Sequence, residues 1–236
     1  MKKIWVAIPT LSGEVYAQHA HSVNVEIYDA INKQIPLVAT YHIGDSLIHR
    51  CRNLMVMKFL ASDFTELVMV DADVAFEPGA LCKLASHPVD IVGAAYPFKT
   101  DEMGFPVRWL NNDLLYSDEN GLLEVYAMPT GCLRISRKAI EAMIAKFPEL
   151  EYAEAKAPQG KAYALFDFVR QNGIMYGEDY VFCALAKEAG YKIYCDPDVK
   201  LEHIGPQRHQ GHLGEWLKSR NDPFSVINAF NAKNAA

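Results

Sequence analysis

The chain has 236 residues, with 23 basic against 29 acidic side chains and a formal net charge of -6. Half of the residues are hydrophobic, so a chain of this length can form one domain with a full core. The acidic balance argues against broad, charge-driven binding of nucleic acid, although a local basic patch is compatible with it.

The cysteine pattern and the length of the apolar runs bear on the cellular compartment of the protein. The five cysteines, at positions 51, 82, 132, 183 and 195, form no C-x-x-C pair. Their odd number and spacing disfavour a disulfide framework or a cysteine zinc site and favour a reducing cytoplasm. The apolar run that starts at Ile4 is too short for a signal peptide, and no later run approaches the roughly 18 apolar residues of a membrane span. We expect a cytoplasmic protein without a transmembrane segment, and the sequence leaves its oligomeric state open.

Strand-like and helix-like segments alternate in the first half of the chain. Apolar runs typical of buried strands occur at residues 4–8, 37–41, 66–70 and 91–95. Helices are expected between them over residues 14–33, 45–60 and 78–84. Asp45 is the expected N-cap of the second helix, and Pro78 opens the third. The alternation predicts an α/β fold with a mostly parallel central sheet flanked by helices, in a single domain over residues 1–227. The last residues, 228–236, are expected to be a frayed tail.

The second half is less regular. Strands are expected at residues 123–126, 132–135 and 191–195, and helices over residues 136–146 and 179–189. Ser136 is the expected cap of the first of these helices, and Gly190 ends the second. Residues 99–121 are expected to form loops or a hairpin. Residues 148–161 are polar and alanine-rich, with a proline and a glycine, and predict a mobile loop.

The triplet Asp71-Ala72-Asp73 follows an apolar strand. In sheets of this kind ligands gather at the carboxyl ends of the strands. Mg²⁺ and Mn²⁺ prefer carboxylate oxygens and commonly bridge them to a diphosphate. The triplet therefore predicts a metal site, with an exposed acidic turn as the structural alternative.

Two later segments carry groups that suit the same chemistry. Glu178 and Asp179 follow Gly177 at the start of a predicted helix, where one of them can act as a general base. Carboxylates are also favoured at helix N-termini for purely structural reasons. His203 follows a strand and precedes a glycine-containing, cationic loop that can wrap a diphosphate, with His203 on the metal and Arg208 on a phosphate. A packed or surface histidine is the alternative there.

In this order and at these separations, the segments resemble the GT-A glycosyltransferases, in particular compact family-2-like members of bacterial or viral type. The most specific part runs from Gly177 through residues 189–191 to Gly205. Arg52-Asn53 and the segment from Thr130 to Ser136 are also similar to that family. The resemblance covers nearly the whole chain, from residue 7 to the loop after His203.

The resemblance implies a role for each site residue. Asp73 and His203 would be metal ligands, and Asp71 would reach the metal or the ribose through water. Thr10, Arg52 and Arg208 would lie beside the nucleotide. Asp179, or its neighbour Glu178, would take the proton from the acceptor hydroxyl, and Asp179 as the base implies inversion at the anomeric carbon.

The implied activity is hexosyl or pentosyl transfer that depends on Mn²⁺ or Mg²⁺. The donor would be a nucleotide sugar, a UDP-sugar in particular, and the acceptor a glycan, a lipid or a modified nucleic acid such as a DNA base. Lys138, Arg134, Arg137 and Lys146 can form a basic face for the last of these, although a solvated helix face is the simpler account.

Three other functions compete with transfer. A sugar nucleotidyltransferase usually has a basic, glycine-rich loop after its first strand, and residues 9–14 contain no lysine or arginine. The intact set of Asp71, Asp73, Asp179 and His203 argues against a nucleotide-sugar-binding protein that has lost catalysis. A zinc protein would use His203, His209 and His212, but these histidines have no cysteine partners in the sequence.

Overall fold

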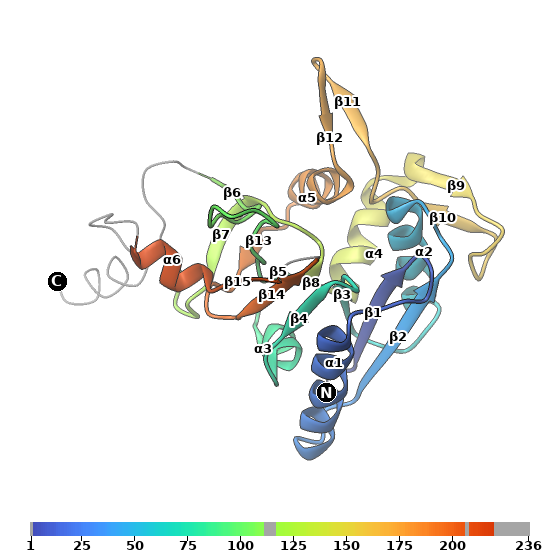
Figure 1. Cartoon of the computed structure of the whole chain (residues 1–236). Coiled ribbons are helices and arrows are strands. Elements are labelled where there is room, and N and C mark those ends of the chain that lie inside the picture. Colours follow the sequence, from blue (N-terminus) through green and yellow to red (C-terminus); the bar gives the residue numbers. More distant parts are fainter. Residues whose placement is uncertain (1, 111–116, 206–207, 220–236) are drawn as a thin grey trace.

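An eight-stranded sheet crosses the molecule (Figure 1), and its strands in spatial order are β2 (Leu37–Ile43), β1 (Ile4–Thr10), β3 (Glu66–Val70), β8 (Cys132–Ser136), β5 (Ile91–Gly93), β13 (Ile193–Cys195), β7 (Leu123–Ala127) and β6 (Arg108–Trp109). The computed structural model describes residues 2–110, 117–205 and 208–219, and only the backbone of residues 208 and 209. The pairs β1–β2, β1–β3 and β5–β13 are parallel. Strand β8 is antiparallel to β3 and β5, and β7 to β13 and β6. All strands except β8 and β7 point the same way, so the predicted α/β fold with a mostly parallel sheet is confirmed.

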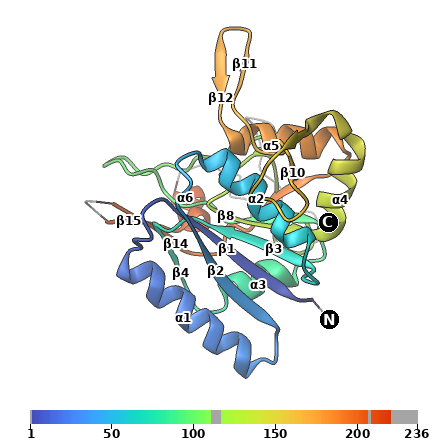
Figure 2. The ribbon, with the colours of Figure 1, turned by 90° about the vertical axis from the view of Figure 1, so that its right-hand side faces the viewer.

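Helices cover both faces of this sheet (Figures 1 and 2): α1 (Ala17–Asn32) and α3 (Ala80–Ser86) lie on one face, and α2 (Ile48–Leu60), α4 (Arg137–Lys146) and α5 (Glu178–Glu188) on the other. Each face has its own hydrophobic core. Val68 of β3 packs with Val23 in one core, and its neighbour Leu67 packs with Phe59 and Phe182 in the other. Successive strand residues point to opposite faces, so a strand covered on both sides is apolar throughout, as the run in β3 predicts.

Smaller sheets surround the centre. Strand β14 (Leu201–Ile204) lies between β4 (Val74–Phe76) and β15 (Arg208–Gly211), and both pairings are antiparallel. Strands β11 (Val169–Gln171) and β12 (Ile174–Tyr176) form a hairpin that projects from the body (Figure 1). Its two turn residues, Asn172 and Gly173, both have positive φ, 52° and 79°, which matches the twist of a tight hairpin. The helix α6 (Leu213–Ser219) is the last described element.

Two predicted loops are wrong. Residues 148–161 form the short helix η1 (Pro148–Leu150) and the strand β9 (Glu151–Ala153), which pairs with β10 (Lys161–Tyr163). Ala162 of β10 is fully buried against Leu54 and Met57 of α2, and this tertiary packing outweighs the polar composition. The segment from residue 205 to residue 214 contains β15 and the beginning of α6 in place of a continuous loop. The predicted tail, 228–236, lies outside the described residues.

Two predicted helix starts are also shifted. Helix α2 begins at Ile48, and Asp45 folds the turn before it by accepting a hydrogen bond from the Leu47 amide, 3.1 Å, and pairing with Arg50, 2.9 Å. Asp45 is therefore a turn residue and not the N-cap. Helix α3 begins at residue 80, after Gly79, whose φ of 83° is left-handed and does not suit a helix that starts at Pro78. Ser136 caps α4 as predicted, since its Oγ accepts a hydrogen bond from the Ala139 amide.

The cysteines are packing residues. All five are buried thiols. Burial raises the pKa of Cys51 to about 11 and that of Cys132 to about 12, so neither is a ready nucleophile at neutral pH. Among the described residues, no helix is both long enough and apolar enough to cross a lipid bilayer.

Candidate active site

A cavity of about 520 Å³ opens where β1 and β3 end. These strands are parallel neighbours, so their carboxyl ends meet at one edge of the sheet. Thr10, at the end of β1, lines the cavity together with Asp71 and Asp73, which follow β3. The Thr10 hydroxyl donates to the Glu14 carbonyl at 2.8 Å and so folds the loop after β1 over the cavity. The structure thus brings together three of the residues that the sequence indicated.

Arg52 connects the two acidic segments from behind the cavity. Its side chain is 3% exposed, and its Nη2 pairs with Oδ1 of Asp71 at 2.9 Å. Its Nε lies 3.5 Å from Oε1 of Glu178, at the first turn of α5. Asp71 and Glu178 more than offset the effect of burial, so the pKa of Arg52 stays above its usual value and the guanidinium remains charged. Arg52 is not a wall residue of the cavity; it fixes where Asp71 and Glu178 lie.

Asp73 and His203 face each other because β14 pairs with β4 and places His203 opposite Val74. The distance from His203 Nε2 to Asp73 Oδ2 is 3.6 Å. His203 Nδ1 lies 2.9 Å from the Pro97 carbonyl, which can only accept, so Nδ1 carries a proton, and Nε2 is the ring nitrogen directed towards Asp73. Metal-binding histidines commonly have this arrangement.

The Asp73 carboxylate also has a cation beside it. Lys99 Nζ lies 2.6 Å from Asp73 Oδ2, the same oxygen that His203 faces. Burial raises the pKa of Asp73, but the hydrogen bonds of His203 and Lys99 outweigh it and hold the pKa at about 2. Asp73 is therefore an anion at every physiological pH.

These residues fit a divalent cation only in part. Within the described part of the chain, no three His, Cys, Asp or Glu side chains are grouped so that they could hold a metal ion. Asp73 and His203 supply an oxygen and a nitrogen that converge, whereas Asp71 is directed to Arg52. A pair of protein ligands completed by water and substrate phosphates is the usual arrangement for Mg²⁺.

Glu178 and Asp179 have different surroundings, although they are neighbours on the first turn of α5. Glu178 faces the Arg52 guanidinium. Asp179 accepts a hydrogen bond from the Tyr180 amide at 2.7 Å, and burial, with the nearby charge of Glu178, raises its pKa. A carboxylate with a raised pKa is the better proton acceptor, so Asp179 is the stronger candidate for a general base.

Sequence reasoning missed the parts played by Gly131 and Tyr96. A Cβ atom on Gly131 would lie 2.5 Å from Asp71 Oδ2 and 2.7 Å from the Tyr96 ring, so only glycine fits there. Tyr96 in turn packs its ring on His203, with centroids 4.5 Å apart. Gly131 lies in a segment that is similar to the family, whereas Tyr96 and Lys99 belong to no motif. The sequence signal for Tyr96 and Lys99 is their position just after the predicted strand at residues 91–95.

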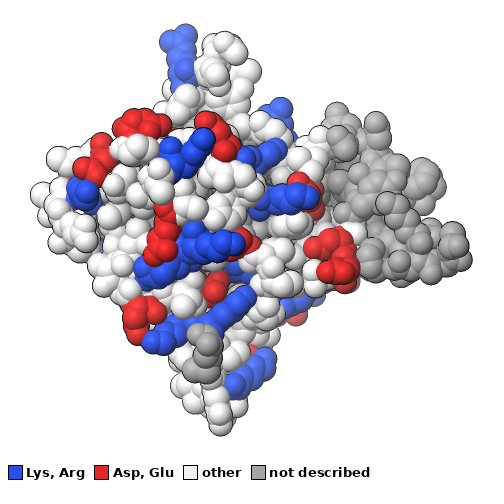
Figure 3. Space-filling view, turned by 180° about the vertical axis from the view of Figure 1, so that it is seen from behind, with Lys and Arg blue, Asp and Glu red and all other residues white. Residues whose placement is uncertain are grey.

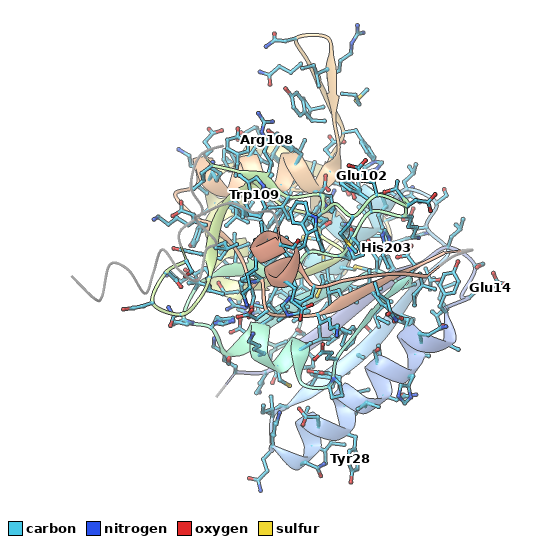
Figure 4. All side chains as sticks on the ribbon, turned by 60° about the vertical axis from the view of Figure 1, so that its left-hand side comes forward. Glu14, Tyr28, Glu102, Arg108, Trp109 and His203 are labelled. Atoms are coloured by element: carbon cyan, nitrogen blue, oxygen red, sulfur yellow. The ribbon has the colours of Figure 1, made fainter. Side chains whose placement is uncertain are left out.

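Of the three histidines of the alternative zinc site, the two whose side chains the structure describes have separate partners. His203 is directed to Asp73, and the His212 ring accepts a hydrogen bond from the Glu215 amide at the start of α6. Figure 4 labels His203 and Glu14, a residue that lines the cavity, both towards the right of the view. Arg208 pairs with Ile204 through the backbone of β15, and the side chains of Arg208 and His209 lie outside the described residues.

The predicted basic face is also not formed. The Arg134 side chain is fully buried, and its guanidinium donates to the backbone carbonyls of Leu84, His87 and Val89. Arg137 donates to carbonyls at the end of α2. Lys138 pairs with Asp90. Basic and acidic side chains intermingle over the described part of the face in Figure 3.

Comparison with known proteins gives a likeness of fold. No family model matches the chain, and no curated protein matches it. Among solved structures, A197 from STIV has a TM-score of 0.54 at 16% identity, over 88% of this chain and 93% of that chain. The catalytic domain of Drosophila β1,4-galactosyltransferase 7 with xylobiose has a TM-score of 0.49 at 12% identity, over 97% and 84%. S. aureus TarS 1-349 has a TM-score of 0.44 at 12% identity, over 96% and 68%.

The chain shares its fold with A197 from STIV over most of both chains. Matched structures include glycosyltransferases of viral, bacterial and animal origin. At identities of 16% and below, the likeness concerns the fold alone. What the chain does must be argued from its own site.

Proposed function

We propose that this chain is a metal-dependent glycosyltransferase that moves a sugar from a nucleotide-sugar donor to an acceptor hydroxyl, with inversion. One observation carries the proposal: Asp73 lines a cavity at the ends of two parallel strands, and His203 faces its carboxylate. The size of the cavity, about 520 Å³, suits a ligand such as a nucleotide. Thr10 and Asp71, on its wall, would contact the nucleoside.

Asp73 and His203 would hold Mn²⁺ or Mg²⁺, which supplies positive charge to the diphosphate when it is bound. The chain's own residues perform the remaining work. The acceptor oxygen attacks the anomeric carbon while the bond from that carbon to the donor phosphate oxygen breaks. The nucleoside diphosphate leaves with the bonding electron pair, and Asp179 takes the proton of the acceptor hydroxyl.

The network around Arg52 couples the donor and acceptor sides. One guanidinium holds Asp71, on the cavity wall, and Glu178, beside the base. Arg52 pairs with Glu178, so of the two neighbouring carboxylates only that of Asp179 is available to accept a proton. This division suits general base catalysis. Glu178 is thereby a positioning residue, and Asp179 is the proton acceptor.

The substrates of the proposed reaction are assigned by class. A UDP-sugar is the first donor to test, since hexosyl and pentosyl donors share the diphosphate that the site would bind. Glycan, lipid and modified nucleic acid acceptors all offer a hydroxyl. The internal contacts of Arg134 and Arg137 give little support to a nucleic acid, because those side chains are not presented as a basic surface.

A panel of UDP-, GDP-, CDP- and ADP-sugars with Mn²⁺ tests the function. We expect at least one to raise the melting temperature and to be hydrolysed slowly, with release of the nucleoside diphosphate. Asp73→Asn should abolish both effects. Lys192→Met, which breaks the pair of Lys192 with Glu124 away from the site, should retain them. Absence of stabilisation and turnover across the whole panel would overturn the proposal.

A further inference from the structure

Lys99 pairs with Asp73 at the carboxylate oxygen that His203 also faces. Its Nζ lies 2.6 Å from Asp73 Oδ2, and His203 Nε2 lies 3.6 Å from the same atom. The ammonium thus sits against the oxygen that would bind a divalent cation. The other carboxylate of the triplet, Asp71, offers no substitute, because Arg52 holds it at 2.9 Å.

The Lys99–Asp73 pair is built so that it can be broken. Both side chains are about one-third exposed, 34% and 33%, and pairs of this kind contribute only about 0.2–1 kcal/mol. Lys99 lies in the stretch between β5 and β6, outside helix and strand, so no regular hydrogen bonding opposes its displacement. By contrast, Arg52 is 3% exposed and is fixed by two carboxylates.

From this geometry we propose that Lys99 is a tethered competitor that keeps the divalent cation off Asp73 until a diphosphate binds. The diphosphate supplies the anionic oxygens that take over the ammonium, and Asp73 is then free to join His203 on the metal. Metal and nucleotide therefore bind with positive coupling, each raising the affinity of the other by the same factor. This inference rests on the proposed function and adds the order in which the site is filled.

The first test measures Mn²⁺ binding without nucleotide, from the electron paramagnetic resonance signal of free Mn²⁺. Lys99→Met should bind Mn²⁺ about threefold to fivefold more tightly than the wild type, since loss of a pair worth up to about 1 kcal/mol corresponds to roughly that factor. Lys99→Arg keeps the cation and should behave as the wild type. Lys192→Met is the matched control, because its pair with Glu124 has a similar length, 2.7 Å, away from the site.

The second test repeats the titration with saturating UDP, or with GDP, CDP or ADP if one of those binds better. The wild type should gain more Mn²⁺ affinity from the nucleotide than Lys99→Met does, so the coupling factor falls in the variant. If Lys99→Met binds Mn²⁺ no more tightly than the wild type and shows the same coupling, the role of Lys99 is refuted while the proposed function stands. If the wild type binds Mn²⁺ with none of the four diphosphates, the proposed function itself fails.

Discussion

Replacement of Arg52 by methionine tests whether one buried guanidinium holds the two acidic segments together. The substitution keeps an unbranched, nonpolar stem but removes the charge from a side chain that is 3% exposed. Asp71 and Glu178 then lose their partner while their side chains are only 24% and 14% exposed. Removal of one partner of a buried ion pair costs about 3–5 kcal/mol. The partial exposure of both carboxylates favours the lower end, about 3 kcal/mol.

The assay is urea unfolding followed by circular dichroism, with the free energy of unfolding extrapolated to water. A loss of about 3 kcal/mol in a domain of this size corresponds to a fall in melting temperature of roughly 6–12 °C. Lys192→Met, which breaks only an exposed pair, should leave the free energy of unfolding close to that of the wild type. The double variant Arg52→Met/Glu178→Gln should recover part of the loss, because it removes one of the two unpaired charges. If Arg52→Met costs no more than Lys192→Met, the bridging role of Arg52 is wrong.

The remaining predictions concern the proposed base, Asp179, and the close approach of Gly131 to Asp71. Asp179→Asn should slow transfer by about 10²- to 10⁴-fold with little change in donor affinity, and near wild-type transfer, or retention of anomeric configuration by nuclear magnetic resonance, would contradict the assignment. Burial raises the pKa of Asp179, and the base must be deprotonated, so transfer should fall as pH drops through a value above the usual aspartate range; a rate that stays flat down to pH 4 would argue against it. Gly131→Ala places a methyl group 2.5 Å from Asp71 Oδ2, and should cost about 1–3 kcal/mol of stability and weaken nucleotide binding, measured by calorimetry. An unchanged nucleotide affinity in that variant would show that Asp71 does not need its present position.

The sequence predicted the site residues that lie at the ends of β1 and β3 and at the start of α5. Apolar runs locate β1 and β3 well, and their shared direction brings Thr10 and Asp73 to one edge. His203 was expected at the metal from its position after a strand and before a cationic loop, and from the family resemblance. The structure brings the two together by pairing β14 with β4, an antiparallel contact between segments far apart in the chain.

What the sequence missed depends on contacts across that distance. Lys99 belongs to no recognisable motif, and the importance of Lys99 and Gly131 follows from a 2.6 Å ion pair and a 2.5 Å approach that only the folded chain creates. The contact between Arg52 and Asp71 is a further one that the sequence does not reveal. Arg52, expected beside the nucleotide, pairs with Asp71, while Asp73 and His203 face each other.

The short strands around residues 151–163 escaped prediction because three residues carry too little periodic signal. Tyr152 and Ala162 pair across the two strands and pack against α2. Tertiary burial fixes that hairpin, and composition alone does not reveal it. The same holds for the buried Arg134, whose charge in the sequence indicated a surface.

The measurement that tests the metal site most directly is turnover of the best nucleotide sugar in Mn²⁺, with and without chelator. The comparison uses the wild type, Asp73→Ala and His203→Ala. We expect turnover in the wild type to require the metal and to be restored when Mn²⁺ is added back after chelation. Both variants should lose most of their turnover and most of their response to Mn²⁺. Full wild-type turnover in chelator, or a metal response in both variants equal to that of the wild type, would contradict the assignment of Asp73 and His203 as the residues that hold the cation.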